Sequence, residues 1–351
     1  MVKVLIVDDS AFMRNAISSM LSSDHEINIV GTAKDGLEAI EKVVLLKPDI
    51  VTLDIEMPRM DGLTALKHIM EKTPVPVIML SSLTVDGAKE TLDAFDLGAV
   101  DFIPKNLSDL SVNIVKIKES LIEKVKHLAK RGVVRRRRPA SASIAAHTPR
   151  PVLKVRSTGE RKVTLVSIGT STGGPKALQE IIPLMPKDFP IPIVIAQHMP
   201  ANFTGPFAER LNQLSSITVK EAEDGEALKA GVALIAPGWG HMRVTRVRGI
   251  ETIVSVTPGS KEEYIYRPSV DALMLSVSEF FPGRALGVVL TGMGADGAKG
   301  AAAMKSTGSR IFAQNEESCV VYGMPKAVVD AGLADKVLDL EEIAGEIVNS
   351  V

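Results

Sequence analysis

Short apolar runs alternate with amphipathic segments along residues 1 to about 125. The apolar runs are rich in Val and Ile and are bounded by Asp, Gly and Pro, which is typical of buried strands. Helices are expected between them, for example at 10–21, where Ser10 is placed to cap the N-terminus. The expected strands are 3–7, 27–33, 49–53, 76–80 and 100–103. Five such alternations predict a parallel sheet covered on both faces.

A second series of strands and helices begins near residue 161. The expected strands are 162–169, 191–197, 232–238, 285–292 and 309–315, and the expected helices are 173–185, 269–281, 294–308 and 323–332. Two further runs, 241–247 and 251–257, suggest a pair of antiparallel strands in the middle of the second half. The second half is therefore expected to be a doubly wound, mainly parallel α/β domain.

The chain between the two series loses its periodicity. Residues 110–130 still predict a final helix, but 131–151 consist mainly of Arg, Ser, Ala and Pro with few large apolar groups. We expect a solvated tether, although its arginines could also bind an acidic partner. The predicted parts are a first domain at 1–125, a flexible basic linker at 126–160 and a second domain at 161–351.

Composition limits the classes of function. A chain of 351 residues is long enough for two domains. Its formal net charge of -1 gives no electrostatic reason to expect binding to nucleic acid or to a membrane surface. The single cysteine, Cys319, cannot form an internal disulfide and fits a reducing compartment. Because neither a signal peptide nor a long apolar run is recognisable, we expect a cytoplasmic protein without membrane insertion.

Three acidic side chains come directly after predicted strands of the first half. Asp8 and Asp9 follow the first strand, and Asp54 follows the third. In a doubly wound sheet of order 2-1-3-4-5 these strands are neighbours, and the binding crevice lies at their carboxyl ends. Converging carboxylates repel one another and need a cation, for which hard oxygen ligands favour Mg²⁺. Lys105 and Ser81, at two further strand ends, could contact phosphate oxygens.

These motifs resemble response-regulator receiver domains, which have a flavodoxin-like (βα)5 fold. The resemblance implies that Asp54 accepts a phosphoryl group from a histidine kinase. It also implies that Asp8, Asp9 and Asp54 hold Mg²⁺ together with the backbone carbonyl of Glu56. The segments that carry the resemblance are "VDD", "LDIEMPRMDG", "MLSS" and "DFIPK".

The same resemblance implies a switch in the first half. Ser81 and Lys105 would sense the acyl phosphate, and Phe102 would occupy the aromatic switch position. The added charge is expected to bias a two-state surface. Many receivers control a DNA-binding domain, but the second half shows strand–helix alternation and no helix-turn-helix pattern. We therefore expect a different output and no nucleic-acid binding.

A serine lies in the glycine-rich turn "SIGTSTGG" of the second half, at 167–174. Ser171 follows an apolar strand and precedes Pro175, which suits the first turn of a helix. A strand–turn–helix setting lifts a nucleophilic hydroxyl clear of the sheet. The turn could instead cradle a phosphate, although it has neither G-K-[ST] nor G-x-G-x-x-G. This stretch alone leaves both interpretations open.

A nucleophilic serine needs a base and an orienting carboxylate. His198 comes just after a buried strand, whereas the domain's other histidine, His241, starts the predicted hairpin. Asp296 follows another buried strand in a glycine-rich turn, where it could also cap a helix. Three strands that end in Ser, His and Asp favour acyl transfer at one crevice. The chain order Ser–His–Asp differs from the common hydrolase orders.

The second half resembles the catalytic domain of chemotaxis protein-glutamate methylesterases. The segments that carry this resemblance are "GTSTGGP", "IAQHMP", "APG" and "LTGMGADGA". It implies that Ser171 is the nucleophile, that His198 is the general base and acid, and that Asp296 orients the imidazole. The backbone N–H of Met293 would contribute to the oxyanion hole.

The combined resemblance implies a hydrolase that phosphorylation activates. Its substrates would be γ-glutamyl methyl esters of chemoreceptors, and certain receptor glutamines would be deamidated by the same route. The phosphodonor would be the chemotaxis histidine kinase CheA. Ester hydrolysis would need no cofactor, and Mg²⁺ would belong to the receiver. The alternative is a response regulator whose second half only binds receptors as a non-catalytic adaptor.

Overall fold

The chain forms two compact units, Met1–Arg138 and Pro139–Val351. The computed structural model describes residues 1–105, 110–131, 163–247, 251–258 and 264–351. In those residues no helix is both long and apolar enough to cross a membrane.

The first unit is built on a five-stranded sheet. Its strands are β1 (Val2–Val7), β2 (Ile27–Ala33), β3 (Ile50–Asp54), β4 (Val77–Ser81) and β5 (Asp101–Pro104). All neighbouring strands are parallel, in the order β2-β1-β3-β4-β5. The side chains of β3 are buried along its whole length, as a sheet covered on both faces requires. The predicted fold and strand order are confirmed.

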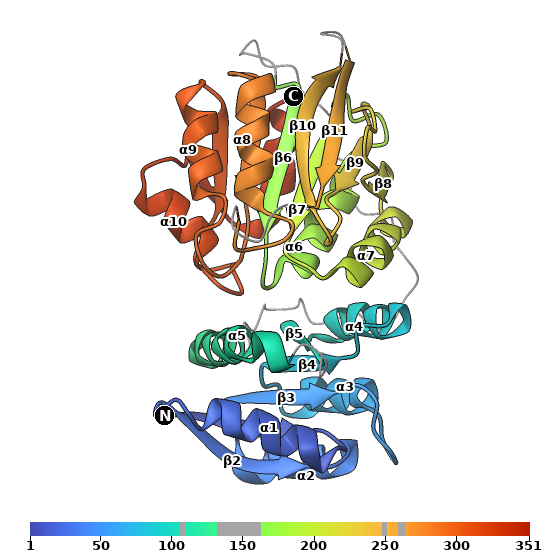
Figure 1. The fold of residues 1–351 in the computed structure, drawn as a ribbon, viewed down its shortest axis with the longest axis vertical. Coiled ribbons are helices and arrows are strands. Elements are labelled where there is room, and N and C mark those ends of the chain that lie inside the picture. The colour runs from blue at the N-terminus through green and yellow to red at the C-terminus, as the bar shows by residue number, and fades with distance from the viewer. Residues whose placement is uncertain (106–109, 132–162, 248–250, 259–263) are drawn as a thin grey trace. The chain divides into compact units, whose positions relative to one another are not determined.

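Five helices cover this sheet (Figure 1). They are α1 (Ala11–Leu21), α2 (Gly36–Leu46), α3 (Gly62–Lys72), α4 (Val85–Leu97) and α5 (Leu110–Arg131). α1 packs with α5, and α2, α3 and α4 pack in sequence on the other face. Ser10 caps α1 as expected, because its side chain accepts a hydrogen bond from the N–H of Met13. Since α5 continues past residue 125 and residues 132–160 lie outside the described chain, the domain boundaries stay a prediction.

The second unit contains a seven-stranded sheet and a separate hairpin. The sheet strands are β6 (Leu165–Thr170), β7 (Ile193–Gln197), β8 (Thr218–Glu221), β9 (Val232–Ile235), β12 (Ala285–Val289), β13 (Arg310–Gln314) and β14 (Lys336–Leu338). They pair in parallel in the order β14-β13-β12-β6-β7-β9-β8. The hairpin joins β10 (His241–Val247) to β11 (Glu251–Thr257) in antiparallel register, as predicted.

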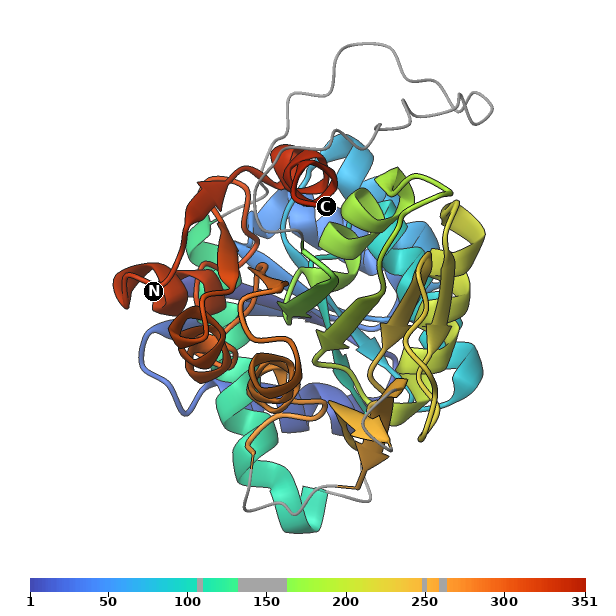
Figure 2. The ribbon, with the colours of Figure 1, turned by 90° about the horizontal axis from the view of Figure 1, so that it is seen from above.

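The helices of the second unit lie on both sides of its sheet. They are α6 (Gly174–Ile181), the short 3₁₀ helix η1 (Ile182–Leu184), α7 (Ala201–Leu214), α8 (Val270–Phe280), α9 (Ala298–Ser306), α10 (Met324–Asp330) and α11 (Leu340–Asn349). α6 packs with α7 and α11, which lies beside it in Figure 2. α8, α9, α10 and the β10–β11 hairpin share the other core layer. The predicted doubly wound α/β class is therefore confirmed.

β6 is the switch point of this sheet, because the chain leaves it toward β7 on one side and returns as β12 on the other. The carboxyl ends of β12, β6 and β7 consequently lie next to one another. Ligands of open α/β sheets bind in such a crevice. The three polar residues singled out in the sequence follow these three strands.

Candidate functional sites

Ser171, His198 and Asp296 form one hydrogen-bonded chain. The Nδ1 atom of His198 lies 3.1 Å from the Oγ of Ser171, and its Nε2 lies 2.7 Å from Oδ2 of Asp296. A carboxylate can only accept, so Nε2 carries the proton and Nδ1 is the free acceptor that faces the serine hydroxyl. The imidazole can therefore remove the hydroxyl proton in a single step.

Asp296 is held by the N-terminus of α8. Its Oδ2 accepts the N–H of Val270 at 2.8 Å, and its Oδ1 accepts the N–H of Asp271 at 2.9 Å and the hydroxyl of Ser269 at 3.1 Å. Burial opposes the charge of Asp296, but the hydrogen bonds from His198 and from these N–H groups hold its pKa below the usual range. The carboxylate therefore stays ionised at neutral pH and stabilises an imidazolium.

The turn that carries Ser171 is shaped by glycines. Gly173 has a φ of 79°, which favours glycine, and caps α6. A Cβ built on Gly292 would lie 2.8 Å from the Cβ of Ser171, so only glycine lets the turn after β12 approach the serine this closely. Met293 follows Gly292 directly, which keeps its N–H a candidate for the oxyanion hole.

Gln197 and Tyr266 contact the reactive residues, and neither was predicted from the sequence. The amide nitrogen of Gln197 donates to the carbonyl oxygens of both Ser171 and His198, at 3.0 Å each. The ring of Tyr266 stacks on the imidazole of His198 with centroids 4.5 Å apart and planes inclined by 11°. Gln197 was only the last residue of an expected strand, and Tyr266 precedes α8 in a segment without periodicity.

Replacing Asp296 with Asn should lower the rate of ester hydrolysis by roughly 10³- to 10⁴-fold, because an amide also donates and no longer fixes the imidazole tautomer. The initial rate of methanol release from methylated receptors measures this. A variant within about threefold of the native rate would contradict the orienting role.

The same replacement should change how stability depends on pH. The pKa of Asp296 is lowered from 3.8 in the folded protein, so its ionisation stabilises the fold above that pH. This contribution is lost as the pH falls through the lowered value. Denaturant unfolding should therefore show a steeper loss of stability below about pH 4 in the native protein than in Asp296→Asn. Equal acid dependence of the two proteins would be inconsistent with the lowered pKa.

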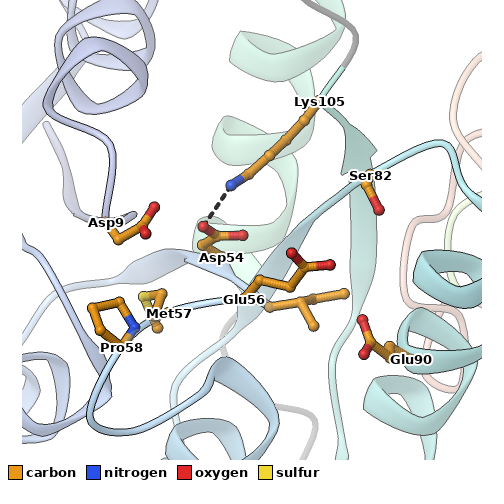
Figure 3. A pocket seen from close by; sticks show the side chains of 9 residues that line it. Asp9, Asp54, Glu56, Met57, Pro58, Ser82, Glu90 and Lys105 are labelled. Atoms are coloured by element: carbon orange, nitrogen blue, oxygen red, sulfur yellow. Dashed lines mark ion pairs between the residues drawn. The ribbon is translucent and has the colours of Figure 1, made fainter.

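A pocket lies at the carboxyl ends of β1, β3 and β5 in the first unit (Figure 3). Its volume is about 520 Å³. The Nζ of Lys105 lies 2.5 Å from Oδ2 of Asp54 and 2.8 Å from Oδ2 of Asp8. The lining residues are Asp9, Asp54, Ile55, Glu56, Met57, Pro58, Ser82, Glu90 and Lys105. Ser82, directly after β4, and Glu90, in α4, also line this pocket and were not predicted from the sequence.

Asp8, Asp9 and Asp54 fit a divalent cation. Each offers one carboxylate oxygen, and these oxygens all lie within 4.8 Å of one another. Burial raises the pKa of Asp54 to about 6, although the hydrogen bond and charge of Lys105 lower it. A cluster of two buried carboxylates and the exposed Asp9 is stabilised by a cation, and hard oxygen donors suit Mg²⁺.

Ser81 and Phe102 do not line this pocket, and both have contacts with α4. The Oγ of Ser81 donates to the carbonyl of Gly87 at 3.1 Å and accepts from Oγ1 of Thr91 at 2.7 Å. Both partners belong to α4. Phe102 is buried and meets Phe95 of α4 edge-on, with centroids 6.2 Å apart. Ser81 and Phe102, two of the three expected switch residues, therefore both contact α4.

The folds and sites define a class of protein: a parallel α/β unit with an acidic pocket at its strand ends, joined in one chain to an α/β unit with a Ser–His–Asp site. The response regulator receiver family model matches residues 4–114, and the CheB methylesterase family model matches residues 166–347. The chain belongs to the family of CheB methylesterases with an N-terminal receiver domain.

Full-length relatives and a solved structure agree with this assignment. A protein-glutamate methylesterase/protein-glutamine glutaminase of Oleidesulfovibrio alaskensis is 53% identical over 370 residues, covering 100% of each chain. One from Nitratidesulfovibrio vulgaris is 50% identical, again with 100% coverage of both. The catalytic domain of CheB methylesterase from Thermotoga maritima is 43% identical, with a TM-score of 0.51 over 53% of this chain and 98% of that one.

Proposed function

We propose that the protein hydrolyses γ-glutamyl methyl esters of chemoreceptors, deamidates certain receptor glutamines, and is activated by phosphorylation of Asp54. The observation that carries the hydrolase proposal is the position of His198 between Ser171 and Asp296. Relatives of about 50% identity over their whole length bear the name protein-glutamate methylesterase/protein-glutamine glutaminase.

The reaction follows from the atoms that face one another. His198 Nδ1 takes the proton of the Ser171 hydroxyl while Oγ attacks the ester carbonyl carbon. The carbonyl oxygen becomes an oxyanion, for which the N–H of Met293 is the proposed donor. The tetrahedral intermediate collapses, and methanol leaves with the proton from His198. An ester between the substrate's glutamyl group and Ser171 remains.

Water then completes the cycle. His198 Nδ1 accepts a proton from a water molecule while the water oxygen attacks the acyl carbon. The Ser171 oxygen then leaves with that proton. The products are a glutamate side chain and the free enzyme. For a glutamine substrate the first leaving group is ammonia instead of methanol.

Phosphorylation would act through the first unit. Asp54 is the proposed acceptor, and Asp8, Asp9 and the carbonyl of Glu56 would hold Mg²⁺ with it. The cation would shield the negative charges that meet when a phosphodonor approaches. Lys105, which already contacts Asp54, would pair with a phosphoryl oxygen. The proposed donor is the chemotaxis kinase CheA.

Hydrolysis separates this proposal from the adaptor alternative. Receptor membranes that carry radiolabelled methyl esters are incubated with the full-length protein, and volatile methanol is counted. An enzyme releases label with turnover well above one equivalent. An adaptor binds the membranes and releases none.

A further inference from the structure

Two buried aspartates connect α8 and α9 in a reciprocal arrangement. Asp296 lies two residues before the start of α9, and its side chain accepts the first N–H groups of α8. Asp271 lies in the first turn of α8, and its Oδ1 accepts the N–H of Gly297 at 2.9 Å and of Gly300 at 2.8 Å. The N-terminus of α8 therefore binds the carboxylate of Asp296 from the turn before α9, and the N-terminus of α9 binds the carboxylate of Asp271, where the helix dipole favours negative charge.

These bonds close a ring around Asp296. The main chain of Asp271 holds the Asp296 side chain, and the Asp271 side chain holds Gly297, the residue directly after Asp296. Asp271 therefore binds both the carboxylate of Asp296 and the main chain directly after Asp296. This matters because the Asp296 Oδ2 lies 2.7 Å from His198 Nε2.

The approach of α9 to α8 supports a specific role for this ring. A Cβ built on Gly300 would lie 2.4 Å from the Cβ of Met274, so the helices meet at a distance that only glycine allows. At that distance the Gly300 N–H reaches the Asp271 carboxylate. Gly297 has a φ of 99° and a Cβ there would lie 2.8 Å from Cγ1 of Val270. The turn after Asp296 is therefore built around Asp271.

We propose that Asp271 is a positioning residue for ester hydrolysis, which acts by fixing Asp296 and through it the imidazole of His198. This inference rests on the proposed hydrolase function. The essential feature is an acceptor oxygen at the Oδ1 position, because that atom receives both N–H groups. Because the bonds from Gly297 and Gly300 need only that acceptor oxygen, and burial disfavours the charged form and raises the pKa of Asp271, a neutral acceptor of the same shape should serve as well.

Four variants of the full-length protein test this role. Asp271→Ala removes the acceptor, Asp271→Glu displaces it by one methylene, and Asp271→Asn keeps it without the charge. Asp339→Ala is the matched control, because Asp339 caps α11 in the same unit. The measurements are kcat and KM for methanol release, and the downfield proton resonance of His198 Nε2–H, identified by its loss in His198→Gln.

Asp271→Ala and Asp271→Glu should lower kcat by roughly 10- to 100-fold with KM within about twofold, and should shift or broaden the resonance. Asp271→Asn and Asp339→Ala should keep kcat and the His198 resonance close to their native values. The inference is overturned if Asp271→Glu has the native kcat and the native resonance. It is also overturned if Asp271→Asn loses as much activity as Asp271→Glu. Neither comparison needs the alanine variant, so both can be made even if Asp271→Ala does not fold. If the native protein releases no methanol, the proposed function fails, and the resonance still decides whether Asp271 positions the imidazole.

Discussion

Ser171→Ala should reduce methanol release from methylated receptors by at least about 10⁴-fold, because it removes the hydroxyl that His198 Nδ1 faces. The acyl route then has no nucleophile, and the oxyanion donors alone cannot replace it. Binding to receptors should be retained, since the change removes one small oxygen. Initial rates at equal concentrations of folded protein measure the effect.

Ser167→Ala is the matched control for this experiment. Ser167 lies earlier on β6, and its buried hydroxyl has no hydrogen-bond partner in the described chain. Its removal should leave the rate within about twofold, as expected for a hydroxyl that makes no bond. A Ser171→Ala protein that still hydrolyses at the rate of this control would exclude Ser171 as the nucleophile.

Asp54→Asn should abolish stimulation by a phosphodonor while leaving basal hydrolysis intact. An amide cannot form the acyl phosphate, so the coupling between the two units, expected to be about 5- to 150-fold in rate, is lost. The ratio of methanol release with and without acetyl phosphate, in the presence of Mg²⁺, measures the coupling directly.

Asp49→Asn controls for the loss of an acidic group from the same strand region. Asp49 precedes β3 at its other end and accepts the N–H of Lys3. This variant should be stimulated like the native protein. If Asp54→Asn responded to acetyl phosphate as strongly as Asp49→Asn does, Asp54 would not be the acceptor.

Much of the fold was predictable because most of its strands are buried. β1 and β6 are apolar runs that a sheet covered on both faces requires, and the turns after them carry Gly, Asp and Ser. The missed helix α11 has a clear signal, a capping box of Asp339 and Glu342, but the other missed elements of the second unit give weaker signals. β8 has four residues and is only partly buried, and the three residues of β14 are mostly exposed. α7 contains Gly205 and Pro206, which disfavour a helix in isolation.

The three triad residues were predictable because each follows its own buried strand. Their supporting contacts were not, because these depend on distances between elements far apart in sequence. Asp271 accepts from Gly297 and Gly300 only once α8 and α9 have packed. Tyr266 likewise stacks on His198 only in the folded protein, because the two residues are far apart in the sequence. Sequence patterns report local structure and strand ends, whereas these contacts arise from tertiary packing.

The most direct test of a phosphorylation-activated esterase is the initial rate of methanol release by the native full-length protein, with Mg²⁺, before and after addition of acetyl phosphate. The account predicts measurable basal release and an increase of about 5- to 150-fold. Release that is absent, or that acetyl phosphate does not change, would contradict it.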